Sequence, residues 1–559
     1  MLKKIDIILY YGLFVLAFVL PISIAATNIV WIFLFLVWLI KIIQKKSEDF
    51  SSPVTYSILL FFSITIISAV FGINFFRSIK GLNSEMEFFL FFLILSNVKD
   101  FAHAKKIILV FVISSAIMGF LGLLQYLTDK NLPTREIFSM MDGRAHGTRS
   151  WPQTYAEGLL MALPVSIYAI LYYRKKIFYL ITVLIFLGIV FSYVRMVWIA
   201  TVFIGCIIFF VEFGHLKRVI YILVAALYIA LISGFFISGR RNIIKRATNF
   251  NEPVRINMWK VGIKIFKDYP VLGVGLKNTR KIYPEYYEKL KLPKEFYMLS
   301  HLHSNFIHLL AERGVLGLIA FLWLVAVFFY YSIKKARNVS NDEKFFILGC
   351  IFGIFGFFLS GLSEYSYGDS EVQMTMWFLM ALTFYRSRAV FLDRDGTINE
   401  DMHYSTDEAK LKIFEESAPA IKLLNNAGFK VIIVSNQSGV ARKYFTKKDV
   451  EKLNNIIVKN LKEKNAVINS IYVCPHHPDD KCFCRKPKPG MVLRAKNEFN
   501  ISLKNSYIVG DMQSDIDLAK NVGVKSVFVL TGDIKEVKGA DYVAKDILDA
   551  AKRILRNAD

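Results

Sequence analysis

The feature that most constrains the fold of this chain is a series of long apolar runs that fill the first 385 residues and then stop. An α-helix needs about 20 mostly apolar residues to cross the ~30 Å hydrocarbon core of a bilayer. We place twelve candidate spans near residues 7–25, 28–43, 55–73, 84–97, 107–127, 156–173, 177–194, 196–213, 219–238, 314–332, 345–363 and 372–385. The sequence therefore predicts a polytopic all-α membrane domain over residues 1–385 and a soluble domain over residues 388–559.

Composition and charge agree with this division. Apolar residues make up 55% of the chain and aromatic residues 15%, which fits a chain dissolved largely in lipid. The formal net charge of +24 would suit nucleic acid, but much of the basic charge lies in clusters beside the apolar runs. Such clusters set membrane orientation and attract anionic head groups. We therefore expect membrane lipids as partners, and no nucleic acid.

The basic clusters also predict the topology of the membrane domain. Six of them fall on the same side of the twelve predicted spans, and the positive-inside rule makes that side cytoplasmic. They are Lys3/Lys4, Lys41/Lys45/Lys46, Lys99/Lys105/Lys106, Arg174/Lys175/Lys176, Lys217/Arg218 and Lys334/Lys335/Arg337. Both ends of the chain, and the soluble domain, are then expected in the cytoplasm. Two long loops, 128–155 and 239–313, are expected outside.

Four segments of the membrane domain resemble the O-antigen ligase and polymerase family. The main one is S-H-L-H-S-N-F-I-H-L-L-A-E-R-G-V-L-G-L, residues 300–318. The others are R-A-H-G-T-R-S-W-P-Q-T-Y-A (144–156), V-R-M-V-W-I-A (194–200) and R-I-N-M-W-K…D-Y-P-V-L-G-V-G (255–275). The chain departs from the family pattern at Ser304, which separates a His from an Asn that are adjacent in many members.

The resemblance implies metal-free transfer of a glycan from a polyisoprenyl-pyrophosphate carrier to a lipid acceptor in the inner (cytoplasmic) membrane. By motif, Arg195 and Arg255 would hold the pyrophosphate leaving group, since guanidinium groups bind phosphate oxygens bidentately. His303 would be the base that deprotonates the acceptor hydroxyl. Other readings remain open: His301 as the base, Arg195 as an interfacial side chain, and a polymerase or a transporter as the function.

The soluble domain reads as strands alternating with helices, which predicts a parallel, Rossmann-like α/β sheet. Three apolar runs end in polar motifs: 388–392 in D-R-D-G-T, 430–434 in S-N-Q-S-G and 506–509 in G-D-M-Q-S-D. A further strand is expected over 526–530, and helices over 417–427 and 447–464. Because ligands bind at the carboxyl ends of such strands, the motifs are expected to form one site.

This motif set resembles the haloacid dehalogenase-like phosphatases, which form an aspartyl-phosphate. Asp393 would attack phosphorus, and Asp395 would protonate the leaving oxygen and later activate water. Mg²⁺ would be held by the Asp393 carboxylate, the Asp395 backbone carbonyl and Asp511. Ser435 and a lysine would complete the phosphate cradle.

The segment C-P-H-H-P-D-D-K-C-F-C between residues 474 and 484 predicts a structural zinc site. Cys-x-His followed by Cys-x-Cys supplies four ligands of the types found in closed tetrahedral sites, and a cytosolic location disfavours a disulfide. We expect the ligands to be Cys474, His476, Cys482 and Cys484, with His477 as the alternative to His476.

The zinc loop and the following C-R-K-P-K-P-G-M resemble the D-glycero-D-manno-heptose 1,7-bisphosphate 7-phosphatases of lipopolysaccharide synthesis. The resemblance makes Lys486 the phosphate-binding lysine, with Lys488 as its rival, and gives Arg485 to the second phosphate of a sugar bisphosphate substrate. Asn436 is expected to bind substrate as well. Histidinol-phosphate phosphatase, which shares the zinc loop, is the alternative. The two halves together predict a bifunctional lipopolysaccharide biosynthesis protein.

Overall fold

The computed structural model describes residues 2–45, 50–128, 144–212, 253–294, 297, 301–337 and 339–557. The chain divides into two compact units. The N-terminal unit comprises Met1–Val98 and His103–Phe384, and the C-terminal unit comprises Lys99–Ala102 and Tyr385–Asp559.

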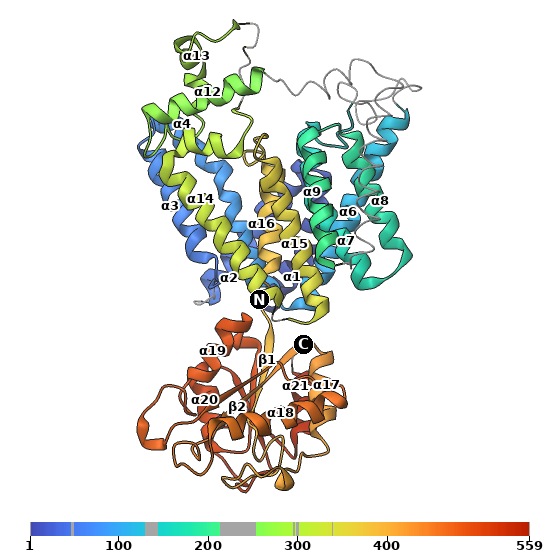
Figure 1. Ribbon diagram of the computed structural model, residues 1–559, viewed down its shortest axis with the longest axis vertical. Helices are drawn as coiled ribbons and strands as arrows, with labels where there is room; N and C mark the ends of the chain where they lie inside the picture. The colour runs from blue at the N-terminus through green and yellow to red at the C-terminus, as the bar shows by residue number, and fades with distance from the viewer. Residues whose placement is uncertain are drawn as a thin grey trace. The chain divides into compact units, whose positions relative to one another are not determined.

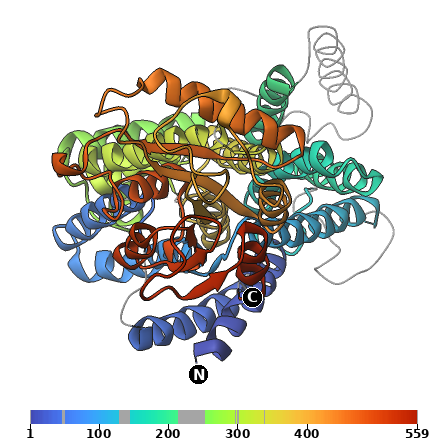
Figure 2. The ribbon, with the colours of Figure 1, turned by 90° about the horizontal axis from the view of Figure 1, so that it is seen from below.

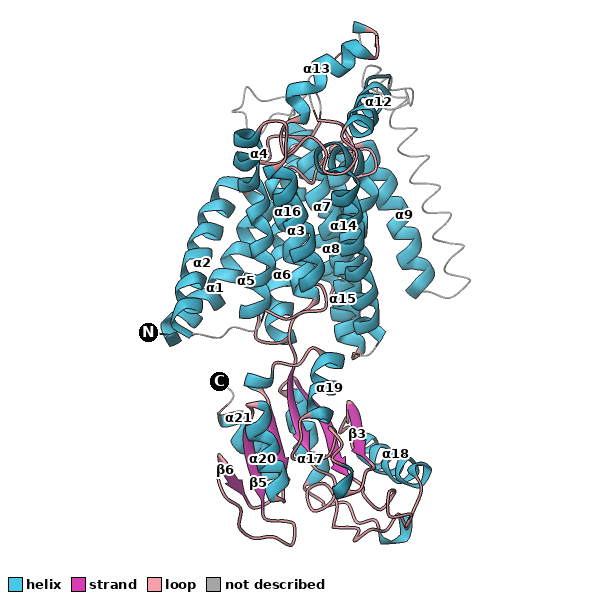
Figure 3. Cartoon of the chain, turned by 90° about the vertical axis from the view of Figure 1, so that its left-hand side faces the viewer, coloured by secondary structure: helices cyan, strands magenta, loops and turns pink. Residues whose placement is uncertain are grey.

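Every regular element that the structure describes in the N-terminal unit is a helix. Besides a 3-10 helix at Leu82–Phe88, they are α1 (Leu2–Ile22), α2 (Ile24–Lys45), α3 (Thr55–Val70), α4 (Phe75–Gly81), α5 (Phe89–Asn97), α6 (Phe101–Thr128), α7 (Pro152–Tyr173), α8 (Lys176–Phe191), α9 (Arg195–Glu212), α12 (Pro253–Asp268), α13 (Thr279–Lys289), α14 (Asn305–Arg337), α15 (Asn341–Ser360) and α16 (Ser370–Thr383). The long helices run side by side in Figures 1 and 3, and Figure 2 looks along them.

Seven of these helices are long and apolar enough to cross a bilayer, among the residues that the structure describes. Two shorter apolar helices, α3 and α8, overlap predicted spans as well. The predicted span at 84–97 corresponds to a 3-10 helix followed by the nine-residue α5. The predicted span at 219–238 lies outside the described residues. The polytopic helical architecture is therefore confirmed, and the total of twelve spans stays a prediction.

Helix α14 is broken near its start, and another part of the chain fills the break. Gly314 has φ 65°, a left-handed conformation that glycine adopts without steric cost. The segment before α13 lies against this break: the Val274 N–H donates to the Ala311 carbonyl at 3.0 Å, and the Val315 N–H donates to the Pro270 carbonyl at 2.8 Å. Backbone groups that the helix cannot pair internally are thus satisfied by two of the predicted family motifs pairing with each other.

The C-terminal unit is built on a six-stranded, all-parallel sheet in the order β3-β2-β1-β4-β5-β6. The strands are β1 (Arg388–Leu392), β2 (Phe429–Asn436), β3 (Ser470–Cys474), β4 (Tyr507–Gly510), β5 (Lys525–Val529) and β6 (Tyr542–Ala544). Figure 3 shows them in magenta. The four strands predicted from apolar runs are β1, β2, β4 and β5. The two that sequence reasoning missed lie at the edges and are only partly buried.

Helices cover both faces of this sheet. On one face lie α17 (Ser417–Asn426), α18 (Lys447–Glu463) and α21 (Ile547–Arg556), and on the other lie α19 (Gly490–Phe499) and α20 (Gln513–Val522). In β1, Val390 and Leu392 belong to the first core and Ala389 and Phe391 to the second. Burial on both faces explains why this strand reads as an uninterrupted apolar run.

Candidate functional site

The strand order of the C-terminal unit brings its predicted motifs to one edge of the sheet. Asp393 follows β1, Ser435 and Asn436 end β2, and Asp511 follows β4. Because β2, β1 and β4 are neighbours in a parallel sheet, the three motifs emerge side by side at its carboxyl edge. This is where ligands bind in open α/β sheets.

A buried lysine lies between two buried carboxylates at this edge. The Lys486 Nζ is 2.7 Å from Asp393 Oδ2 and 2.7 Å from Asp515 Oδ1. All three side chains are buried, and Asp515 is 0% exposed. Burial alone would lower the pKa of Lys486, but the two carboxylates outweigh it and raise that pKa, so the lysine carries a positive charge.

The site holds more negative than positive charge. Asp393, Asp511 and Asp515 offer carboxylate oxygens within 4.8 Å of one another, and Lys486 balances only one of these charges. Burial raises the pKa of Asp393 well above its usual range, against the pull of Lys486, and burial with the nearby Asp515 raises the pKa of Asp511 to about 6. Three buried carboxylates with an excess of negative charge fit a hard divalent cation such as Mg²⁺.

Asp395 is held by a different set of partners. Arg394 donates from Nε to Oδ1 at 3.1 Å and from Nη2 to Oδ2 at 2.7 Å. Asn399 donates to Oδ1 at 2.9 Å, and Gln437 donates to Oδ2 at 2.8 Å. The Gln437 amide also donates to Ser435 Oγ at 2.9 Å. The side chain of Asp395 is thus oriented by four donors, while Ser435 is linked to it through Gln437.

The other residues predicted to bind substrate have different surroundings. The Asn436 side chain contacts the backbone of Lys486: its Oδ1 accepts from the Lys486 N–H at 3.0 Å, and its Nδ2 donates to the Lys486 carbonyl at 3.3 Å. Arg485 is partly buried and donates from Nη1 to the His476 carbonyl at 3.5 Å. Lys488, the rival for the role of Lys486, is exposed.

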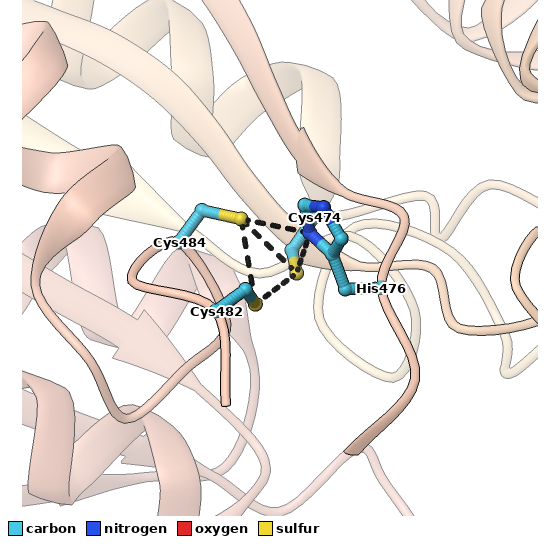
Figure 4. A group of neighbouring side chains, drawn as sticks. All are labelled: Cys474, His476, Cys482 and Cys484. Atoms are coloured by element: carbon cyan, nitrogen blue, oxygen red, sulfur yellow. Dashed lines mark hydrogen bonds between the residues drawn. The ribbon is translucent and has the colours of Figure 1, made fainter. Parts of the chain in front are cut away.

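The four predicted zinc ligands lie together at the end of β3 and in the loop that follows (Figure 4). Five of the six pairs among their Sγ and Nδ1 atoms are 3.2–3.6 Å apart. Tetrahedral ligands with bonds of ~2.0–2.3 Å to zinc would be about 3.3–3.8 Å apart. The neighbouring His477 instead faces Asp479, with its Nδ1 at 3.1 Å from Oδ2.

The chemistry of this donor set also fits a metal. Burial raises the pKa of the Cys474 thiol to about 12. Such a thiol ionises at neutral pH only beside a strong positive charge, and bound zinc supplies one. The loop then continues directly into Arg485 and Lys486, so a closed zinc site here would fix the path of the chain into the carboxylate cluster.

In the N-terminal unit, the predicted residues gather around one carboxylate that sequence reasoning missed. Glu364 lies in the segment between α15 and α16 and is 4% exposed. Its Oε1 is 2.7 Å from Arg255 Nη2, and its Oε2 is 3.3 Å from His303 Nδ1. Arg195, at the start of α9, lies within electrostatic range of both Arg255 and Glu364. Burial would raise the pKa of Glu364, but His303 and Arg255 lower it, so Glu364 is ionised.

The segment that carries Glu364 is anchored by Asn305, the first residue of α14. The Asn305 Oδ1 accepts hydrogen bonds from the backbone N–H groups of Ser366 and Tyr367, both at 2.9 Å. His301, the alternative base, lies beside His303 with ring centroids 4.4 Å apart. Burial and the neighbouring imidazoles lower the pKa of His301 to about 3, so that ring is neutral. Ser304 lies between His303 and Asn305 in the sequence, but both residues belong to this site: His303 contacts Glu364, and Asn305 binds the segment that carries Glu364.

Comparison with known proteins gives matches in both units. The family described as O-Antigen ligase matches residues 180–322, and the family described as HAD-hydrolase-like matches residues 483–550. The D-glycero-beta-D-manno-heptose-1,7-bisphosphate 7-phosphatase of Yersinia pestis is 39% identical over 178 residues, which are 30% of this chain and 94% of that protein. Its counterpart in Helicobacter pylori strain J99 is 38% identical over 26% of this chain and 84% of that protein.

Through its C-terminal unit, this chain belongs to the heptose-bisphosphate phosphatase family. A solved structure, the D,D-heptose 1,7-bisphosphate phosphatase of B. bronchiseptica complexed with magnesium and phosphate, is 30% identical; the match covers 31% of this chain and 99% of that chain, with a TM-score of 0.29. In the N-terminal unit, the match to the O-Antigen ligase family covers residues 180–322. The two units are called the phosphatase unit and the ligase-like unit below.

Several residues of the phosphatase unit contribute to the site without having been predicted. Asp515 is the second acid of G-D-x-x-x-D and lies in the first turn of α20, four residues after Asp511. Arg394 and Gln437 lie inside predicted motifs, but nothing in their spacing shows that they contact Asp395. Asn399 reaches Asp395 because the Arg394 carbonyl accepts from the N–H groups at 398 and 399, which folds that segment back.

Proposed function

We propose that the phosphatase unit removes the 7-phosphate of D-glycero-D-manno-heptose 1,7-bisphosphate through an aspartyl-phosphate on Asp393. The observation that carries the proposal is the buried Asp393–Lys486–Asp515 cluster, which puts a nucleophile beside a fixed positive charge at the carboxyl edge of the sheet. The family to which the unit belongs supports the choice of substrate.

Two acids share the chemistry. An oxygen of Asp393 attacks phosphorus while the bond from phosphorus to the sugar oxygen breaks, and Asp395 gives its proton to that oxygen. In the second half, water attacks the aspartyl-phosphate and Asp395 takes a proton from it, which releases phosphate and restores Asp393. Lys486 and Ser435 hold the phosphoryl oxygens through both halves.

The Asp393 carboxylate, the Asp395 carbonyl and Asp511 would hold Mg²⁺. When bound, the ion neutralises charge on the phosphoryl group and on the carboxylates. The cysteines at 474, 482 and 484, with His476, would hold a structural zinc ion that fixes the loop leading into Lys486. Arg485 on the same loop would bind the second phosphate of the substrate, which histidinol phosphate lacks.

The test uses residues 387–559 alone. This is a fair unit to test, because the Yersinia pestis relative is matched over nearly its whole length by this part of the chain. Phosphate release would be measured with Mg²⁺ from heptose 1,7-bisphosphate and from histidinol phosphate, with Asp393→Asn as control. Preference for the heptose, abolished in the variant, supports the proposal. Preference for histidinol phosphate would keep the mechanism and overturn the substrate.

For the ligase-like unit we propose transfer of a glycan from a polyisoprenyl-pyrophosphate carrier to a lipid acceptor. The proposal rests on the convergence of Arg195, Arg255 and His303 around Glu364. The two guanidinium groups would hold the charge that develops on the pyrophosphate as the sugar–oxygen bond breaks. Glu364 accepts a hydrogen bond from His303 Nδ1, which leaves Nε2 as the base that takes the proton from the attacking hydroxyl.

A bacterial strain that lacks its own ligase would test this assignment. The full chain and His303→Ala would be compared for glycan joined to the lipid acceptor and for polymer still joined to its carrier. A ligase predicts that the variant makes polymer but does not attach it. In a second strain that lacks its own polymerase, polymer made with the full chain and lost with His303→Ala would indicate a polymerase. Unchanged attachment in the first strain would leave transport as the function of this unit.

The proposed location is the inner membrane, with both ends and the phosphatase unit in the cytoplasm. This rests on the basic clusters that alternate with the predicted spans. It places the phosphatase unit where soluble sugar phosphates occur, and the arginine–histidine site of the ligase-like unit on the other side. The two activities then serve one pathway without sharing a substrate.

A further inference from the structure

The arginine inside the nucleophile motif has one partner outside every motif. Arg394 is 1% exposed, and its guanidinium group binds both oxygens of Asp395 through Nε and Nη2. Its remaining terminal nitrogen, Nη1, donates to Asn454 Oδ1 at 3.1 Å. Asn454 lies in the middle of α18 and is 6% exposed. It belongs to none of the predicted motifs, and the residues around it in the sequence do not indicate an active site.

The hydrogen bond from Nη1 to Asn454 holds the end of the Arg394 guanidinium group that does not contact Asp395. A guanidinium group that is bound at one terminal nitrogen can no longer rotate about its long side chain, so its two-pronged contact with Asp395 keeps a fixed direction. Asn399 and Gln437 approach the same carboxylate from elsewhere, one at each oxygen. The Arg394 side chain thus connects Asn454 of helix α18 to Asp395, the residue proposed as both acid and base.

We propose that Asn454 is a positioning residue for proton transfer by Asp395, acting through Arg394. The inference rests on the proposed phosphatase function and adds a residue to it. Proton transfer needs the carboxyl oxygen within hydrogen-bond reach of the leaving oxygen and then of the attacking water. Removing the Asn454 oxygen frees Arg394 to turn, so Asp395 keeps its hydrogen bonds from Asn399 and Gln437 but loses the fixed pair of contacts from Arg394 that sets its direction. The attack by Asp393 does not depend on this contact.

The leaving group provides a readout that a merely structural role would not move. A p-nitrophenolate leaves phosphorus without needing a proton, whereas a sugar alkoxide requires one. In Asn454→Ala, kcat/KM for the sugar phosphate should fall about tenfold or more, consistent with the size of general-acid effects. For p-nitrophenyl phosphate, kcat/KM should stay near wild type. The phosphorylated fraction of the enzyme should rise during p-nitrophenyl phosphate turnover, because its hydrolysis still needs Asp395.

The experiment uses residues 387–559 and two further variants. Asn455→Ala, an exposed neighbour on the same helix, should behave as wild type with both substrates. Asn454→Asp keeps an oxygen facing Arg394 and should restore most of the activity with the sugar phosphate, which also covers the case in which the alanine variant folds poorly.

Two results would overturn the inference alone: equal losses with both substrates in both Asn454 variants, or no loss with either. A wild-type unit that hydrolyses neither substrate would instead overturn the proposed function, and the inference with it.

Discussion

The side-chain amide of Asn436 holds the backbone of Lys486 on both sides, accepting from its N–H at 3.0 Å and donating to its carbonyl at 3.3 Å. The end of β2 therefore fixes the loop that carries Lys486. A residue expected to touch the substrate turns out to contact the residue that would touch it.

Replacing Asn436 should show how much its two hydrogen bonds to the Lys486 backbone contribute to stability and activity. Asn436→Ala removes both hydrogen bonds and should cost the phosphatase unit about 1–3 kcal/mol of unfolding free energy, with a lower kcat. Asn436→Asp keeps the acceptor for the Lys486 N–H and should lose less of both. Urea unfolding and phosphate release would be measured side by side. Equal behaviour of the two variants would show that the amide does not hold the loop.

Lys486 should also be a structural residue, because its removal leaves Asp393 and Asp515 buried and unpaired. Breaking a buried ion pair from one side typically costs about 3–5 kcal/mol. Lys486→Ala should therefore lower the free energy of unfolding by this order and abolish phosphate release. Lys488→Ala, at an exposed position two residues on, should change stability by less than about 0.5 kcal/mol. Urea unfolding of residues 387–559 would compare the two.

The zinc content of variants should show which of the two adjacent histidines, His476 or His477, is a zinc ligand. His476→Ala removes one of four clustered donors and should lower bound zinc, measured by elemental analysis of the purified phosphatase unit, well below one ion per chain. His477→Ala removes a side chain that faces Asp479 and should keep one ion. If His477→Ala lost the metal and His476→Ala kept it, the ligand assignment would be reversed.

The raised pKa of Asp511 predicts how the magnesium-free unit responds to pH. Its folded pKa of about 6 lies above the ordinary value of an aspartate, so the folded state binds the proton more tightly than the unfolded state. Stability should therefore increase as pH falls from 7 through 6, and the increase should be smaller in Asp511→Asn. The contribution of Asp511 would be complete only below about pH 4, where the proposed zinc ligands are protonated, so the comparison is made between about pH 7 and 5. Urea unfolding without added magnesium or chelator, which leaves zinc in place, would measure it. Saturating magnesium should reduce the dependence.

Gly314 should be intolerant of a side chain. It has φ 65°, and a Cβ there would collide with the Val271 carbonyl oxygen. Gly314→Ala should destabilise the full chain by at least the roughly 1–3 kcal/mol that such strain typically costs, seen as a lower melting temperature in detergent. Gly158 lies inside α7, and a Cβ there would have nothing within 4 Å. It provides the control: Gly158→Ala should melt at or slightly above the wild-type temperature, because alanine favours a helix more than glycine does.

The residues proposed to do chemistry are easier to predict from the sequence than the residues that hold them. Asp393, Ser435 and Asp511 each follow an apolar run that predicts a buried parallel strand, and the Cys and His spacing predicts a metal-binding loop. Partners such as Asn454 and Glu364 lie far along the chain from the groups they contact. No local pattern marks them, because only the packing of α18 against the sheet, or the return of the chain after α15, makes those contacts.

The bounds of strands and helices could likewise be predicted only where local sequence reflects burial. The run 388–392 was placed correctly because both faces of β1 are buried. The strands β3 and β6 were missed because an edge strand pairs on one side only and is partly exposed. In the ligase-like unit, α14 begins nine residues before the predicted span because its first turns mix apolar residues with His308, Glu312 and Arg313 and lie before the break at Gly314.

The break in α14 also bears on how the chain is made. Its backbone is completed by residues 270–275, which leave the ribosome before residues 311–316 do. The earlier segment is therefore already available when the later helix inserts, and the helix can close against it at once. If a rearranged gene encoded these two segments in the opposite order, the helix would insert with unpaired backbone groups, which would stay unpaired until residues 270–275 had been synthesised.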